Sequence, residues 1–327
     1  MSEHDPLKKS RLGLRGILLA SGSVLVASSV FVLPNTGLLP GTAPTASITG
    51  PLTAATGTPT DPSSDATIES RDATAGAAAA PALLPVYWVA DVDGSGRLFR
   101  EFLPTPEESS GDPIADAVRL MSAGEPLDPD YRSPWQDASS VRSAISTKNV
   151  ITLDISSDAF GGSLGEDDAR LALQQLVYTA TAAASNAGLI PGGESSSVVV
   201  LVDGASGFRA FDSVDLTGEW TRDTATLAPV WIIDPQQDVE ADTAGLIVHG
   251  VGPSSEESVD WRIDRQVDGL GDGSGDAELF RDGSVDIMPG DGAYSFSVTL
   301  PPGRYAITVS VPAGDGEAQD SKTVVVR

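Results

Sequence analysis

Two short runs of aspartate and glycine contain the residues most suited to binding a cation. Asp91–Gly96 reads DVDGSG, which is how a calcium loop begins, but such a loop needs a glutamate at its twelfth position and Phe102 stands there. Asp268–Asp276 reads DGLGDGSGD, and its spacing does not match a nonapeptide calcium repeat. We therefore predict a hairpin turn at the first run, a solvated loop at the second, and no metal or cofactor.

Nucleophilic catalysis has few candidate residues. The chain has no cysteine and two histidines, His4 in the tail and His249 in a strand-like run. These counts exclude a thiol nucleophile, a disulfide framework, a thiolate metal site and metal hydrolysis through histidines. A Ser-His-Asp apparatus would have to use His249, yet no G-x-S-x-G motif is present. We predict that His249 is a half-buried strand residue and not a base.

Paired carboxylates are the remaining route to catalysis. Asp154 and Asp203 lie at or near the ends of two strand-like runs, where turn and cap roles are typical. The sequence gives no distance between carboxylates, so a carboxylate-dependent glycan hydrolase stays open as an alternative. We predict that the protein is not an enzyme, and we assign no catalytic residue.

Three tryptophans could stack on the sugar rings of cell-wall glycan if they are exposed, or form core if they are buried. Trp88 lies inside a predicted strand, which favours the core. Trp135 lies in the proline-rich loop EPLDPDYRSPWQD and is more open to a surface role, and Trp220 lies much later in the same predicted domain, residues 84–224.

The elements that must position these residues centre on a strand, a helix and a second strand. Val150–Ser156 and Ser196–Gly204 are β-branched runs, and between them Leu173, Leu176, Val177 and Ala180 recur with the period of one helix face. Ser163 and Glu166 have the spacing of a capping box, which predicts the start of this helix.

Another helix is predicted before this unit. Asp112 can cap it, Pro113 suits its first position, and Gly124 suits its end. With the flanking strands the order is β-β-α-β-β-α-β, so residues 84–224 are predicted to form an α+β domain, with helices on one face of a mixed sheet.

Residues 228–327 are predicted to form a separate all-β domain. Half-buried alternating strands are separated by Gly, Pro and Asp turns, which is typical of a sandwich of about seven strands. A buried Trp261 on its third strand fits this design, and without a cysteine pair the domain is immunoglobulin-like at most.

The N-terminal 83 residues have the pattern of an anchor and a linker. Residues 1–15 carry four basic side chains, and residues 16–33 carry no charge. At about 1.5 Å per residue this run spans roughly 27 Å, enough to cross a membrane as a signal anchor with residues 1–15 in the cytoplasm. A cleaved signal peptide and a buried core helix are the alternatives. Residues 34–83 are mostly Thr, Ala, Pro, Gly and Ser and have no hydrophobic periodicity, which predicts a disordered linker.

The charge of the chain restricts its partners. The net charge is -26, which argues against nucleic acid and against docking on anionic lipid, since both require clustered basic residues. The simplest function of this acidity is solubility.

The order of these motifs resembles a known family. The pieces VYWVADVDG, ADAVRLMSAGEP, YRSPW, VITLDISSDAF, ARLALQQLVYTAT and VVVLVDG resemble the GerMN domain of bacterial sporulation and spore-germination proteins. VWIIDPQQDVEADTAGLIVHGVG, the Trp261 strand, DGAYSFSVTLPPGRYAITVSVP and KTVVVR resemble the immunoglobulin-like domain that often follows it. Two features depart from the family: the lipoprotein cysteine of many relatives is absent, and the 252–257 loop and the 268–276 insert weaken the match.

This resemblance implies an extracytoplasmic, membrane-tethered protein that is not catalytic. GerMN is similar to the ring-building domains of sporulation machinery, which implies packing between copies or with partners. The family has no agreed site residues, so none is transferred. We therefore expect a single-pass protein of the cell membrane that binds envelope proteins or itself; the alternative is a module that binds cell-wall glycan, with peptidoglycan as its ligand.

Overall fold

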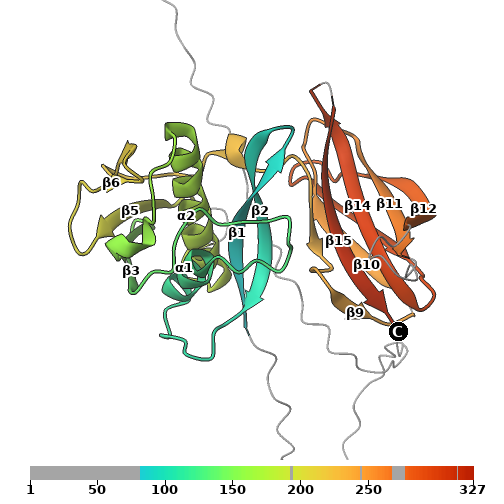
Figure 1. Cartoon of the computed structure of the whole chain (residues 1–327), viewed down its shortest axis with the longest axis horizontal. Helices are drawn as coiled ribbons and strands as arrows, with labels where there is room; N and C mark the ends of the chain where they lie inside the picture. The colour runs from blue at the N-terminus through green and yellow to red at the C-terminus, as the bar shows by residue number, and fades with distance from the viewer. Residues whose placement is uncertain (1–81, 192–193, 244, 267–276, 315) are drawn as a thin grey trace, which may run out of the picture.

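The computed structural model describes residues 82–327 except 192–193, 244, 267–276 and 315. An α+β domain and an all-β sandwich lie side by side (Figure 1). The fold class expected from the sequence is therefore confirmed. The predicted anchor at 16–33, nearly all of the predicted linker and the Asp268–Asp276 loop lie outside the described residues.

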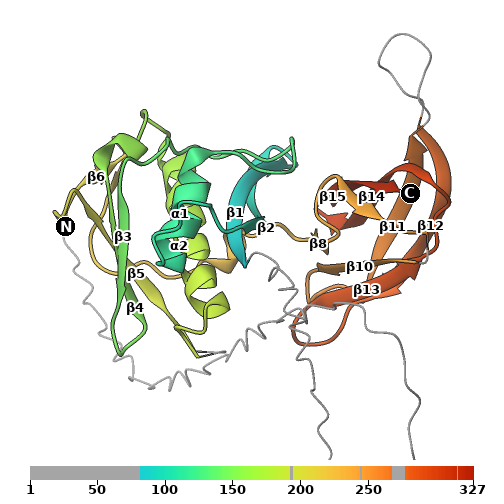
Figure 2. The ribbon, with the colours of Figure 1, turned by 90° about the horizontal axis from the view of Figure 1, so that it is seen from below.

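The α+β domain has two helices between two sheets (Figure 2). The antiparallel hairpin consists of β1 (Leu83–Val92) and β2 (Ser95–Pro104). The helices are α1 (Pro113–Ala123) and α2 (Glu166–Asn186). The second sheet consists of β3 (Val141–Ile145), β4 (Val150–Ile155) and β5 (Ser197–Val202). This second sheet is the expected mixed sheet, since β4 is antiparallel to β3 and parallel to β5. The β1–β2 hairpin forms a separate sheet on the other side of the helices, which the element order alone did not indicate.

Short elements complete the domain. They are η1 (Ser157–Ala159), β6 (Arg209–Ala210), β7 (Val214–Asp215) and η2 (Thr224–Thr226).

The turn between β1 and β2 follows from its sequence. Asp93 and Gly94 both have positive φ, 49° and 74°. A type I′ turn, whose twist matches that of the flanking strands, requires positive φ at both of its central residues. An Asp-Gly pair adopts this conformation with little strain. The Asp91–Gly96 run is therefore the hairpin turn that the sequence predicts.

The free edge of β1 is covered by side chains of α2 and by one loop. Thr179 Oγ1 accepts a hydrogen bond from the Tyr87 amide (3.1 Å), and Gln175 Nε2 donates to the Tyr87 carbonyl (2.8 Å). Val89 exchanges two backbone hydrogen bonds of 2.9 Å with Arg132. Because buried backbone groups must be paired, one turn of α2 and the loop around Arg132 fix where the hairpin packs.

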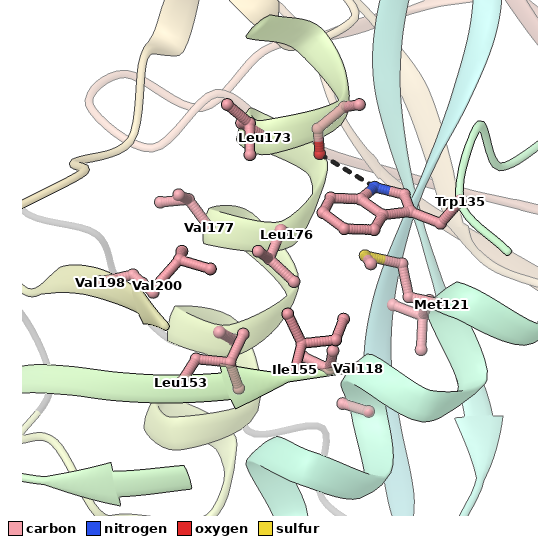
Figure 3. Packing of buried hydrophobic residues seen from close by; sticks show 14 of the residues in the cluster. Val118, Met121, Trp135, Leu153, Ile155, Leu173, Leu176, Val177, Val198 and Val200 are labelled. Carbon is pink, nitrogen blue, oxygen red and sulfur yellow. Dashed lines mark hydrogen bonds between the residues drawn. The ribbon is translucent and has the colours of Figure 1, made fainter. Parts of the chain in front are cut away.

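The core lies between α1, α2 and the β3–β4–β5 sheet (Figure 3). Trp88 is fully buried, and Trp135 is 3% exposed. The Trp135 indole donates to the Ala172 carbonyl of α2 (3.1 Å), which satisfies its polar group inside the core. Trp88 is therefore a core residue as predicted, and the surface role left open for Trp135 is wrong because the proline-rich loop folds back over the helices.

The two helices begin differently. Asp112 caps α1 by accepting from the amides of Ile114 and Ala115, and Gly124 ends α1 with φ 74°, both as predicted. The capping box predicted for α2 is wrong: Gly165 occupies the cap position, and Ser163 instead donates to Asp212. The loop before α2 pairs with the 208–213 segment, and this tertiary contact replaces the local cap.

The sandwich consists of two sheets. One has the strand order β13-β10-β8 and the other has β12-β11-β14-β15-β9. The strands are β8 (Trp231–Asp234), β9 (Val239–Ala241), β10 (Leu246–Val251), β11 (Ser258–Gln266), β12 (Ala277–Asp286), β13 (Ala293–Val298), β14 (Gly303–Ala313) and β15 (Gly316–Val326). The described part thus has one strand more than the sequence estimate, because the short β9 adds in parallel to the end of β15.

Trp261 lies on β11, the fourth strand of the sandwich and not the third. Its ring stacks on Phe296 of β13, with centroids 4.7 Å apart and planes at 11°. A side chain at Gly283 of β12 would collide with the indole, 2.5 Å from its nearest atom. Trp261 is only partly buried and packs against the core of the sandwich.

The part of the chain that the structure describes contains no helix long and apolar enough to cross a membrane.

A cap substitution tests how α1 is held. Asp112 also accepts from the backbone and hydroxyl of Ser143 on β3. We expect Asp112→Ala to lower the free energy of unfolding by about 1–2 kcal/mol, since it removes a helix cap and a link to the sheet edge. The matched control is Ser163→Ala, which we expect to cost less than about 0.5 kcal/mol. Urea unfolding measures both, and equal losses would contradict the assignment of caps.

Candidate functional site

The carboxylates that the sequence offered for catalysis have structural roles instead. Asp154 accepts from the Gly204 amide (2.8 Å) and Asp203 accepts from the Ser157 amide (3.4 Å). These bonds tie together the loops that follow β4 and β5. Such cross-loop bonds are a turn role, and neither carboxylate lines the hollow beside Asp93 and Ala313 or the one beside Phe160 and Asp212. Among the described residues, no group of three or more possible ligands could hold a metal ion.

His249 lies on β10, partly buried, between Asp234 of β8 and Ser295 of β13. Burial raises the pKa of Asp234, and the nearby imidazole lowers it in part. No hydrogen bond joins these three side chains within the described part of the chain. A serine protease mechanism needs a hydrogen-bonded row and a substrate cleft, so this row does not meet its requirements.

The densest cluster of ionisable groups lies elsewhere, at the joint between the domains. Lys322 of β15 is 1% exposed. Its ammonium donates to Asp128 Oδ2 (2.5 Å) and to the Tyr131 hydroxyl (2.6 Å), and it lies 3.4 Å from Asp320 Oδ1. It also lies over the Tyr131 ring, 4.1 Å from the centroid. Asp128 and Tyr131 belong to the loop after α1, so Lys322 joins the two domains directly.

The carboxylates of this joint are held by further hydrogen bonds. Asp320 accepts from the Tyr131 hydroxyl (2.8 Å) and from the Ile232 amide of β8 (2.7 Å). Glu101 of β2 accepts from the Leu127 amide (3.0 Å) and the Asp128 amide (2.9 Å), which fixes the loop that reaches the sandwich. We call Glu101, Asp128, Tyr131, Asp320 and Lys322 the ionic joint.

The charges of the ionic joint do not balance. One ammonium faces three carboxyl groups, all of them at most 5% exposed. Burial raises the pKa of Glu101 against the opposing effect of its two amide donors, and burial raises the pKa of Asp320 against the effect of Lys322. Burial and the neighbouring carboxylates hold the pKa of Tyr131 well above its usual value, so this residue remains a neutral hydroxyl.

The topology of the sandwich explains why the joint forms there. β9 pairs only with Val324–Val326, so β15 has no strand partner at Asp320 and Lys322 on that side. The loop after α1 covers this opening between β15 and β8. Gln236 beside β8 also accepts from the Phe102 amide of β2 (3.1 Å), and Ala228 donates to the Leu98 carbonyl (2.9 Å).

The ionic joint is closed to substrates. Two shallow hollows of the described surface, of about 440 and 170 Å³, are lined by other residues. A general acid or base must be within reach of a bound substrate, and the polar atoms of these groups hydrogen-bond to one another and to the backbone. The cluster therefore fastens the two domains.

An alternating pattern in the sequence indicates this joint, although none of the catalytic or metal-binding motifs contains these residues. Ala318, Asp320, Lys322, Val324 and Val326 alternate along β15 and face the interior together. Glu101 likewise lies between Phe99 and Leu103 on the buried face of β2. Charged residues in phase with an apolar face are a sign of buried pairing, because isolated buried charges are too costly.

Fold and joint together define a two-domain protein in which an α+β domain is fastened to a β-sandwich. The family Germane, described as sporulation and spore germination, matches residues 85–207. The α+β domain is therefore similar to the Germane family, in agreement with the resemblance to GerMN in sequence. The family's description names no reaction.

Three of the solved structures with some similarity are sporulation proteins of Bacillus subtilis. The tandem GerMN domains of GerM are 19% identical over 43% of this chain and 45% of that one, with a TM-score of 0.32. The first GerMN domain of GerM is 16% identical over 43% of this chain and 97% of that one, also with a TM-score of 0.32. The sporulation control protein Spo0M is 16% identical over 31% of this chain and 49% of that one, with a TM-score of 0.21. This chain thus spans less than half of the tandem structure, and none of these scores is high enough to support an argument about function. No curated protein matches the chain.

Removing the ammonium tests the joint. We expect Lys322→Met to lower the free energy of unfolding by about 3–5 kcal/mol, because three buried carboxylates lose their only cation. The control is Arg304→Met, which breaks the exposed pair with Asp238 and should cost at most about 1 kcal/mol. Calorimetry of the two variants measures the difference. A loss at Lys322 no larger than that at Arg304 would contradict the role of the joint.

Proposed function

We propose that this chain is a membrane-anchored, extracytoplasmic protein of the bacterial cell envelope that works by binding other proteins or copies of itself, in a process of the sporulation or germination type. In this proposal the sandwich is the immunoglobulin-like domain expected from the sequence, and the protein is not an enzyme. Residues 16–33 act as the anchor, and the linker holds the two domains away from the membrane.

The observation that carries this proposal is the use of the ionisable groups. The cluster of buried charges that we call the ionic joint fastens one domain to the other, and it lines neither of the two surface hollows described above. Charged groups that fasten the domains together are not available for catalysis, so we expect the protein to act through its binding surfaces and not through a reaction centre. The Germane match at 85–207 supports the same direction, since the family's description is a developmental process.

The edges of the sheets suggest where a partner would bind. The outer edge of β3 is covered, because Asp112 accepts from the Ser143 amide and Arg119 donates to the Val141 carbonyl (2.9 Å). β12 differs: it is ten residues long, it pairs only with β11 among the described strands, and nearly all its residues are exposed. Leu279 on this strand is 48% exposed. Open edge strands are the surfaces that most readily pair with another chain.

The glycan-binding alternative has less support. It relied on exposed aromatic rings, and Trp88 and Trp135 are buried in the core while Trp220 is partly buried. Sedimentation of the protein with purified peptidoglycan remains its direct test, and depletion from solution would revive it.

Two matched leucine substitutions test the proposal. We expect Leu279→Lys on β12 to weaken association at least fivefold, since a central apolar contact is worth more than about 1 kcal/mol. Leu189→Lys is the control, because Leu189 is 45% exposed and lies after α2 in the other domain. The full chain in detergent is examined by sedimentation velocity for self-association and by crosslinking in envelope membranes for partners. A strict monomer that crosslinks to nothing would refute the proposal, and equal weakening by both variants would refute the role of β12.

A further inference from the structure

The ionic joint contains more acid than its single cation can neutralise. The groups that face one another come from every element packed there: Glu101 from β2, Asp128 and Tyr131 from the loop after α1, Tyr294 from β13, and Asp320 and Lys322 from β15. If Glu101, Asp128 and Asp320 were all ionised, the joint would have two uncompensated negative charges in a space closed to water.

We propose that the joint between the two domains is a proton-operated lock, which holds the domains together most tightly when a proton is shared among its carboxyl groups and loosens as that proton leaves. This inference rests on the geometry of the joint and not on the proposed function.

Asp320 is the carboxyl group best placed to hold the proton. Asp128 is in direct contact with the ammonium at 2.5 Å, whereas Asp320 lies 3.4 Å from it. Both oxygens of Glu101 accept backbone amides, which favour its charged form. Asp320 accepts only one backbone amide, that of Ile232, on one oxygen, and the Tyr131 hydroxyl donates to the other (2.8 Å).

The direction of the pH effect follows from linkage. Burial raises the pKa of Asp320 and of Glu101 in the folded protein above the values of the unfolded chain. A carboxyl group of this kind stabilises the joint fully below its unfolded pKa, and that contribution is lost as the pH rises through the folded pKa. The lock is therefore tighter in acid and looser towards neutral and alkaline pH. Asp116 on α1 works in the opposite sense: burial raises its pKa, but bonds from Ser109, Ser110 and Arg119 lower it overall.

Three amides report on the joint without affecting it. The amides of Leu127 and Asp128 donate to Glu101 within the α+β domain, and the amide of Ile232 donates to Asp320 within the sandwich. Their acceptors belong to the ionic joint, so we expect parting of the domains to open these bonds to solvent and to raise their exchange. Each protection factor compares the exchange rate of an amide in unstructured peptide with its rate in the protein at the same pH. This ratio removes the intrinsic dependence of amide exchange on pH.

The test is hydrogen exchange by mass spectrometry on the full chain in detergent between about pH 5 and 8.5. In the wild type we expect protection at Leu127, Asp128 and Ile232 to fall as the pH rises, by up to about tenfold per pH unit for one proton. In Asp320→Asn, which fixes a neutral group at this position, the protection should depend less steeply on pH, with the remaining slope due to Glu101. Asp238→Asn is the control: Asp238 pairs with Arg304 at the surface, and its variant should keep the wild-type slope.

Two results would overturn the proposal. One is a wild-type protection that stays constant over this range, and the other is a parallel fall in wild type and Asp320→Asn. If Asp320→Asn does not fold, Glu101→Gln provides the second reading, because it neutralises the other carboxyl group with a raised pKa and should reduce the slope. An unchanged slope in that variant would also count against the lock.

Discussion

The burial of Lys322 is the constraint on which the arrangement of this protein depends. An ammonium that is 1% exposed can persist only if acceptors surround it, and its two closest acceptors come from the other domain. The sandwich alone would leave this group without Asp128 and Tyr131, and the loop after α1 would leave Asp128 without its cation. Each domain thus completes the other, and the requirement to pair buried charge fixes their relative position.

The rest of the N-terminal domain supports this contact. Glu101 on β2 accepts hydrogen bonds from two backbone amides of the loop after α1. The pairing register of β1 with β2 sets the position of Glu101 along the hairpin. α2 in turn fixes β1 through Gln175 and Thr179. A chain of hydrogen bonds therefore runs from the central helix to the joint.

Much of the fold was predictable because it depends on local patterns. Alternation and helical period located the main strands and helices, and Asp112, Gly124 and the Asp93-Gly94 turn fixed boundaries through backbone geometry alone. The start of α2 and the position of Trp135 were not predictable in this way, since both depend on segments distant in sequence. The separate hairpin sheet was missed for the same reason.

The candidate site was the least predictable feature. Motif searching looks for reactive groups near one another in the chain, whereas Glu101, Asp128 and Lys322 come from three distant segments. Their only local sign was a charge in phase with an apolar face. The pairing of buried charges across domains depends on the assembled fold. The sequence indicates it only where a charged residue lies at a position that the apolar pattern predicts to be buried.

The central claim is that the ionic joint makes the two domains one rigid body. The chain has no cysteine, so a pair introduced at Ala144 on β3 and Ser297 on β13, both exposed, carries spin labels at unique positions. Double electron–electron resonance then measures the distance between the two spin labels, one on each domain. The account predicts a single narrow distribution of distances at about pH 5 that becomes broad when Lys322→Met is added. A distribution that is broad from the start, or that stays narrow in the variant, would contradict it.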